Sequence, residues 1–230
     1  MTSDLVRGGT VNMRLTEEVH PIPLAGGNAY LVCGKRNTLI DTGLPARCEG
    51  LEAAVGKILG DQGCLDAILL THHDVDHVGN VRAMQLIYGC EAYADARDLP
   101  YVRGQKRRPG IKRLIERVAA PAAPVSIRPL EEFHDEEFAV ISTPGHTPGH
   151  VVYLYGDCLF TGDLFKVEDG RLTCMKKRMN VDNAELARSA RKLLDLEATW
   201  IYPGHGDCIE FTDDVREELR KVAERYEREA

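Results

Sequence analysis

The pattern of apolar and polar residues divides the chain into short strands and helices. Apolar runs of strand length predict first-half strands at residues 28–33, 37–41, 65–70 and 91–93. Helical spacing of apolar residues predicts helices at 51–59 and 81–88. The run at 65–70 leads directly into a polar stretch, THHDVDHVG, at residues 71–79. This stretch gathers three histidines and two aspartates, so it needs a compensating interaction such as a bound cation.

The second half of the chain repeats this alternation. Strands are predicted at residues 125–130, 137–142, 151–155, 158–161 and 199–202, and helices at 184–194 and 213–228. Between the halves, residues 96–120 are basic and predicted to be helical up to Pro121. Strands followed by helices in each half predict one domain over residues 1–230, built of two αβ halves at approximately 1–124 and 125–230.

Composition narrows the class of protein. Of the 230 residues, 43% are hydrophobic and 28% charged, which is ordinary for a globular domain. The net charge of −7 provides no basic field for nucleic acid or an anionic membrane, so we expect neither partner. The N-terminal MTSDLVRGG lacks the apolar core of a signal peptide, and the seven cysteines include no C-x-x-C pair. We therefore expect a cytoplasmic protein with reduced thiols.

Polar clusters follow four of the predicted strands. Each cluster places histidine or aspartate in a short loop, and three of the loops contain glycine. They are T-H-H-D-V-D-H at 71–77, T-P-G-H-T-P-G-H at 143–150, T-G-D at 161–163 and P-G-H-G at 203–206. One such loop is typical of a solvated surface, whereas four indicate side chains that converge at one edge of a sheet assembly.

Together with D-T-G at 41–43, these clusters stand in the order of the metallo-β-lactamase-fold hydrolases, which the chain resembles from about residue 28 to 205. The resemblance is to glyoxalase II-like metallo-hydrolases. It implies an α/β (α+β) fold of four layers, an αββα sandwich, and a site for two divalent metal ions.

The same resemblance assigns the ligands by motif position. His72, Asp74 and His146 would hold the first ion, and Asp76, His77 and His205 the second, with Asp163 bridging both. Asp76, Asp163 and Asp41 would be the catalytic carboxylates, Asp41 by orienting a ligand histidine. Such a pair of ions activates a hydroxide and polarises the substrate.

Asp74 departs from the family pattern, because H-x-D-x-D-H stands where the family has H-x-H-x-D-H. Flavodiiron relatives also carry a carboxylate there, and this hard ligand favours iron or manganese over zinc. The alternatives are a weakly filled first site or a single ion in the second. We expect Asp74 to bind through one oxygen, with Asp74, Asp76, Asp163 and a hydroxide balancing two divalent ions.

The remaining histidines and Cys208 receive other roles. Alternation along the loop directs His73 away from Asp74, which predicts a structural or solvated side chain. His150 resembles a family residue that supports the loop. His20 and His134 lie outside every cluster, and Cys208 is expected to pack.

We therefore expect a metal-dependent hydrolase of a small-molecule ester, thioester, lactone or phosphoester. The alternative is an iron-dependent oxidoreductase of the same fold, similar to persulfide dioxygenases or flavodiiron proteins. Leu164-Phe165-Lys166 follows the bridging aspartate where a lactonase would have a tyrosine, which disfavours that subclass.

The sequence leaves open the role of two sets of basic residues. Lys166, Arg171 and residues 176–178 form either a solvated face or a contact for an anionic substrate group. The segment 103–117 either caps the site or is a surface helix broken at Arg108-Pro109-Gly110. The oligomeric state is open, a homodimer included.

Overall fold

The structure is a computed structural model that describes residues 18–45, 48–61 and 63–230. The N-terminal stretch considered above lies outside these residues. In the described part of the chain, no helix has both the length and the hydropathy needed to cross a membrane.

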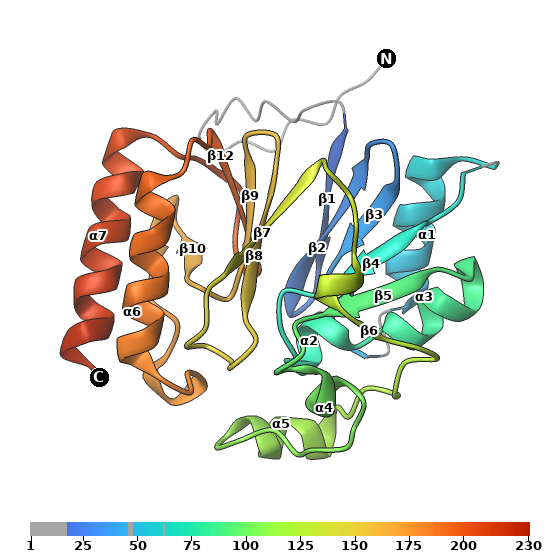
Figure 1. The fold of residues 1–230 in the computed structure, drawn as a ribbon, viewed down its shortest axis with the longest axis horizontal. Coiled ribbons are helices and arrows are strands. Elements are labelled where there is room, and N and C mark those ends of the chain that lie inside the picture. Colours follow the sequence, from blue (N-terminus) through green and yellow to red (C-terminus); the bar gives the residue numbers. More distant parts are fainter. Residues whose placement is uncertain (1–17, 46–47, 62) are drawn as a thin grey trace.

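Within the described residues, the first sheet contains six strands in sequence order. They are β1 (Val19–Leu24), β2 (Gly27–Cys33), β3 (Asn37–Ile40), β4 (Ala67–Leu69), β5 (Glu91–Ala94) and β6 (Arg128–Pro129). Strands β1 to β3 pair antiparallel, and β3 to β6 pair parallel. Helices α1 (Cys48–Leu59) and α3 (Val81–Tyr88) cover its outer face (Figure 1). Strand β6 follows residue 124 yet belongs to this sheet.

The second sheet has five strands in the part of the chain that the structure describes. Their order is β13 (Ile209–Glu210), β12 (Trp200–Pro203), β9 (Cys158–Gly162), β8 (Val151–Tyr155) and β7 (Phe138–Ser142). Helices α6 (Asn183–Lys192) and α7 (Asp213–Arg228) lie on its outer face (Figure 1). A separate hairpin joins β10 (Lys166–Glu168) to β11 (Arg171–Thr173). The layers therefore run helix, sheet, sheet, helix, which confirms the predicted αββα sandwich.

Period-two alternation gives each sheet two buried faces. On β2, Ala29 and Leu31 pack towards the helices, whereas Tyr30 and Val32 point between the sheets. There the Tyr30 ring meets Phe160 and Tyr202 of the second sheet at centroid distances of 5.4 Å each. Because both faces are covered, the central strands appear in the sequence as continuous apolar runs.

The sequence prediction did not include strand β1, which contains Pro21 and Pro23. Among the residues that the structure describes, β1 lies at the edge of the sheet and pairs with β2 alone. Proline is tolerated at such an edge because the missing N–H bond leaves no gap in a ladder.

The predicted helix over 96–120 was wrong in extent. Only α4 (Leu99–Val102) and α5 (Lys112–Val118) are helical. Between them, Gly104 and Gly110 have positive φ angles of 69° and 57°, which a helix does not accommodate. The segment instead folds back across one edge of the sandwich, next to α2 (Val75–Val78) (Figure 1). Single 3-10 turns occur at Leu130–Glu132, Lys177–Met179 and Leu193–Asp195.

The two sheets are also joined by a buried hydrogen bond. The Tyr153 hydroxyl on β8 donates to the Leu70 carbonyl at the end of β4, over 2.7 Å, and both residues are fully buried. Leu70 leads directly into the polar stretch at 71–79, so this bond fixes where that loop begins.

We predict that Tyr153→Phe lowers the free energy of unfolding by about 1–3 kcal/mol, because the Leu70 carbonyl stays buried without its donor. Urea unfolding followed by circular dichroism measures the change. Tyr88→Phe on α3 is the matched control, because Tyr88 is only half-buried. Equal stabilities of the two variants would contradict this role for the bond.

Candidate metal centre

Loops from both sheets bring the predicted ligands to the same edge of the sandwich. His72 follows β4, and Asp74 precedes the short helix α2, which contains Asp76 and His77. The second sheet contributes His146 from the loop between β7 and β8, Asp163 after β9 and His205 after β12. The chain thus gathers seven imidazole and carboxylate groups from segments that are distant in sequence.

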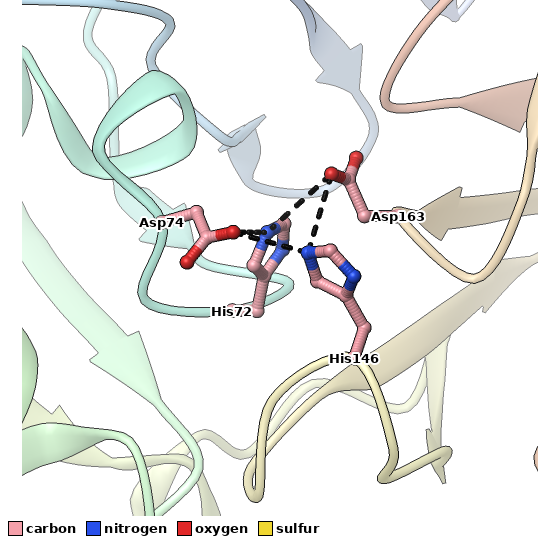
Figure 2. Close-up of side chains that lie close together, drawn as sticks. All are labelled: His72, Asp74, His146 and Asp163. Atoms are coloured by element: carbon pink, nitrogen blue, oxygen red, sulfur yellow. Dashed lines mark hydrogen bonds and ion pairs between the residues drawn. The ribbon is translucent and has the colours of Figure 1, made fainter. Parts of the chain in front are cut away.

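The first subsite consists of His72, Asp74, His146 and Asp163 (Figure 2). Asp74 Oδ2 lies 3.6 Å from His72 Nε2 and 3.0 Å from His146 Nε2. Asp163 Oδ2 lies 3.9 Å from His72 Nε2 and 3.4 Å from His146 Nε2. An ion with tetrahedral bonds near 2.1 Å requires donors about 3.4 Å apart, so this set fits a metal ion.

The second subsite consists of Asp76, His77 and His205, again with Asp163. Asp163 Oδ1 lies 3.2 Å from both His77 Nε2 and His205 Nε2, and Asp76 Oδ2 lies 3.5 Å from His205 Nε2. The two Asp163 oxygens therefore face different subsites. The Asp76 and His205 side chains are 24% and 27% exposed, so this subsite opens to solvent, whereas the first is closed.

The buried lone pairs at the centre support a cation. Among the described residues, His72 Nε2, His77 Nε2 and Asp163 Oδ1 are buried and have no hydrogen-bond donor. The other ring nitrogen is engaged in each histidine: His72 Nδ1 lies 3.0 Å from Thr71 Oγ1, and His77 Nδ1 lies 2.8 Å from Asp41 Oδ2. This is the arrangement of metal-binding histidines, whose second nitrogen donates to a fixed acceptor.

Asp41 holds Thr71 and His77 in place through hydrogen bonds. Its carboxylate accepts bonds from the Thr71 N–H and hydroxyl over 2.8 and 2.7 Å, as well as from His77. Its own backbone has a φ of 58°, in the left-handed region that few residues other than glycine adopt. This strained backbone conformation places one carboxylate within hydrogen-bond distance of both Thr71 and His77. Asp41 thus lies where it orients His77, as the resemblance implied.

Electrostatics at the centre differ between neighbouring groups. Burial lowers the pKa of His72 well below its usual value, and His77 adds to the effect. Burial also disfavours a charged His77, but Asp163 and Asp41 raise the pKa of His77 well above its usual value. Burial raises the pKa of Asp163, yet His205 and His77 together hold it well below the usual range. A metal ion at the second subsite would replace the proton of His77.

His150 is excluded as a ligand by its hydrogen bonds. Its Nε2 accepts the Asp163 N–H over 3.1 Å, and its Nδ1 lies 2.8 Å from Thr143 Oγ1. Burial and the nearby His146 lower the pKa of His150 to about 3, so the ring is neutral. It therefore supports the Asp163 loop, in keeping with the resemblance.

The prediction for His73 was wrong in direction. His73 Nδ1 lies 3.3 Å from Asp74 Oδ1, and the ring is fully buried against Tyr101, with centroids 4.3 Å apart. The loop does not alternate as a strand because Asp74 already begins the turn into α2. His73 is thus structural, packed under α4 rather than solvated.

Three residues of the basic segment serve the centre, and sequence reasoning missed them. Asp98 is fully buried and accepts the His73 N–H, the Thr147 hydroxyl and the Gly149 N–H, over 3.0, 2.7 and 2.7 Å. It thereby joins the loops that carry the two metal-binding motifs. The available signal was charge: Asp98 and Glu116 are the only acids from 96 to 117.

Arg108 and Lys112 are the other two. Arg108 donates to the His73 carbonyl and pairs with Glu116 over 2.6 Å. Lys112 Nζ lies 2.7 Å from Asp74 Oδ2. Burial raises the pKa of Asp74, but Lys112 and the bonded histidines hold it well below its usual range. The charge balance drawn from the sequence left out this lysine. The segment 103–117 therefore covers the site.

The other candidates lie outside the centre. His20 is on β1, His134 is exposed, and Cys208 packs against the core between the sheets. Lys166 pairs with Glu168 in the β10–β11 hairpin, and residues 176–178 line an open groove with Arg225. Whether these basic residues meet an anionic substrate stays a prediction, as does metal binding by each ligand.

Comparison with known proteins gives several relatives. The chain is similar to Beta-lactamase-like protein 2 homolog of Drosophila melanogaster, with 34% identity over 81% of this chain and 61% of the relative. It is 28% identical to Probable metallo-hydrolase YflN of Bacillus subtilis, over 96% of this chain and 95% of the relative. It is 33% identical to Hydroxyacylglutathione hydrolase of Shewanella baltica, over 63% of this chain and 49% of the relative. The chain thus spans less than two thirds of the fly and Shewanella proteins.

Among solved structures, TTHA1623 in a di-iron-bound form superposes with a TM-score of 0.69 and 30% identity, over 87% of this chain and 98% of that one. The model of the Metallo-beta-lactamase superfamily matches residues 22–205, which is more than half of the chain. With the αββα sandwich and the histidine and aspartate cluster in the expected order, the protein belongs to the metallo-beta-lactamase superfamily.

Proposed function

We propose that this protein is a metal-dependent hydrolase in which water attacks an ester, thioester, lactone or phosphoester of a small molecule. One observation carries the proposal: the two oxygens of Asp163 face two separate clusters of imidazole and carboxylate donors. A hydrolase needs an activated water beside a group that polarises the scissile bond, and paired divalent ions provide both. The relatives named as metallo-hydrolases support this reaction class.

The ions, the proposed ligands and the residues around them would have different roles in this reaction. Divalent ions, when bound, would lower the pKa of water and withdraw charge from the substrate's carbonyl or phosphoryl oxygen. His72, Asp74 and His146 would hold one ion, and Asp76, His77 and His205 the other, with Asp163 between them. Asp41 fixes the orientation of His77, and Asp98 fixes the spacing of the two motif loops. The substrate would approach from the second subsite, where Asp76 and His205 are partly exposed.

The nature of the ions is a separate part of the proposal. Three carboxylates among the ligands provide hard oxygen donors, which favours iron or manganese over zinc. The di-iron form of TTHA1623 supports iron in a related fold but concerns the metal rather than the reaction. A small-molecule substrate without nucleic-acid or membrane partners, and a cytoplasmic location, stay predictions.

We predict that Asp163→Asn reduces kcat/KM by about a thousandfold or more, because the carboxylate charge that faces both subsites, and that would position both ions, is lost. The measurement is hydrolysis of a panel of esters, thioesters, lactones and phosphodiesters by protein with a known metal content. Asp207→Asn is the control, since Asp207 is an exposed acid two residues from His205. Circular dichroism establishes that both variants are folded.

Two results would overturn this proposal. One is unchanged turnover in Asp163→Asn, and the other is a metal-loaded wild type that hydrolyses no member of the panel but consumes oxygen with a persulfide. The second result would favour the oxidoreductase of the same fold.

A second prediction concerns the metal preference set by Asp74. We expect Asp74→His to increase the ratio of zinc to iron and manganese, because imidazole is a softer ligand than carboxylate. Mass spectrometry of metals in proteins grown in the same mixed-metal medium measures this ratio. Glu49→His on the exposed side of α1 controls for an added histidine. The same ratio in all proteins would remove Asp74 from metal selection.

A further inference from the structure

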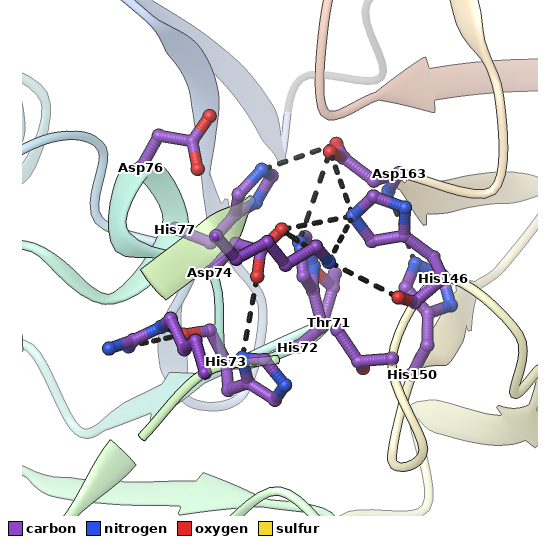
Figure 3. Close-up of polar contacts among 12 residues, drawn as sticks. Thr71, His72, His73, Asp74, Asp76, His77, His146, His150 and Asp163 are labelled. Carbon is purple, nitrogen blue, oxygen red and sulfur yellow. Dashed lines mark hydrogen bonds and ion pairs between the residues drawn. The ribbon is translucent and has the colours of Figure 1, made fainter. Parts of the chain in front are cut away.

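The first subsite already contains a positive charge supplied by the chain. The Lys112 ammonium lies 2.7 Å from Asp74 Oδ2 and 3.1 Å from His146 Nε2, and it donates to the His146 carbonyl over 3.1 Å. Asp74 and His146 are the same side chains that face His72 across the subsite (Figure 3). Lys112 is 3% exposed and Asp74 is 4% exposed, so water screens neither charge.

The packing of helix α5 depends on this lysine rather than on apolar side chains. Lys112 is its only buried residue, whereas Leu114 and Val118 are 57% and 90% exposed. Burial of apolar area therefore does not place this helix. Because a buried ammonium is stable only with a paired charge, the contact with Asp74 holds α5 over the site, assisted by the Arg108 bonds to the His73 carbonyl and Glu116.

The hydrogen bond between Lys112 and His146 determines whether the His146 ring can also bind a metal ion. An ammonium has only donors, so His146 Nε2 accepts through its lone pair. His146 Nδ1 lies 2.9 Å from Asn180 Oδ1, whose amide nitrogen donates to Asn183 Oδ1, so Nδ1 carries the ring proton. An imidazole nitrogen has one in-plane lone pair. A metal ion and the Lys112 ammonium therefore cannot both be bound to His146 Nε2.

If the Lys112 side chain left Asp74 and His146, it would have space nearby. A cavity of about 80 Å³ adjoins Lys112 and Asp74 and is bordered by Asp76, Ile115 and Met179. A flexible four-carbon stem can swing into it while the ammonium stays close to an acidic side chain.

We propose that Lys112 is a built-in occupant of the first metal subsite, where its ammonium and a divalent ion compete for Asp74 and His146. The chain then fills the second subsite first and takes up the other ion only by displacing Lys112. This inference rests on the metal centre of the proposed function, but not on the reaction that the centre catalyses.

The test is calorimetric titration of metal-free protein with Mn²⁺, with the bound metal counted by mass spectrometry. We expect the wild type to bind one equivalent tightly and a second at least about tenfold more weakly, as when a competitor fills the subsite nine times in ten. Lys112→Met, which keeps the length and removes the charge, should raise the affinity for the weaker ion about tenfold. Lys106→Met, at an exposed position of the same segment, should behave as the wild type.

A second measurement uses the wild type alone, in case Lys112→Met does not fold. An amine-reactive reagent followed by peptide mass spectrometry compares labelling of Lys112 with that of Lys106. Lys112 should label slowly without metal and with one equivalent of Mn²⁺, and several times faster after the second.

The proposal is overturned if Lys112 labels as fast as Lys106 in metal-free protein, or if wild type and Lys112→Met bind both ions with equal affinities. A protein that shows the expected binding but hydrolyses nothing overturns the proposed reaction and leaves this inference standing.

Discussion

Lone pairs of imidazole and carboxylate groups face one another in a pocket largely closed to water, and only positive charge makes that arrangement stable. Asp163 stands between the two groups of donors, with one oxygen 3.4 Å from His146 Nε2 and the other 3.2 Å from His77 Nε2. Lone pairs that face neither a hydrogen-bond donor nor a cation are costly in a low-dielectric interior. The rest of the fold serves to hold them together.

The scaffold achieves this with two sheets that are buried on both faces, so that strand ends are rigid and loops converge at one edge. Buried acids then fix the loops to one another. Asp41 binds the Thr71 backbone and His77, and Asp98 joins the His73 backbone to Gly149. Both carboxylates accept N–H groups that would otherwise lie buried without partners. The pocket's geometry thus depends on acids that are not among the proposed ligands.

Positive charge reaches the pocket from an irregular segment rather than from the sandwich itself. The loop between α4 and α5 brings Arg108 to the His73 carbonyl, and the first residue of α5 brings Lys112 to Asp74. An aspartate in place of the family's second histidine adds one negative charge, and the lysine adds one positive charge beside it. The carboxylate of Asp74 in the motif and the ammonium of Lys112 in the segment 103–117 are therefore best understood as a pair.

The sequence by itself predicted most strands from apolar periodicity, which is a local property of the chain, and its resemblance to a known family supplied the four-layer fold and the seven candidate ligands. Helices α3 and α7 begin and end where the spacing of apolar residues predicted. Only the tertiary structure decided the edge strand β1, the course of residues 96–120 and the roles of His73, Asp98 and Lys112. A buried lysine or aspartate looks like a surface residue in the sequence. Its role depends on the charge or N–H groups that lie opposite it, and these come from distant segments that only folding brings together.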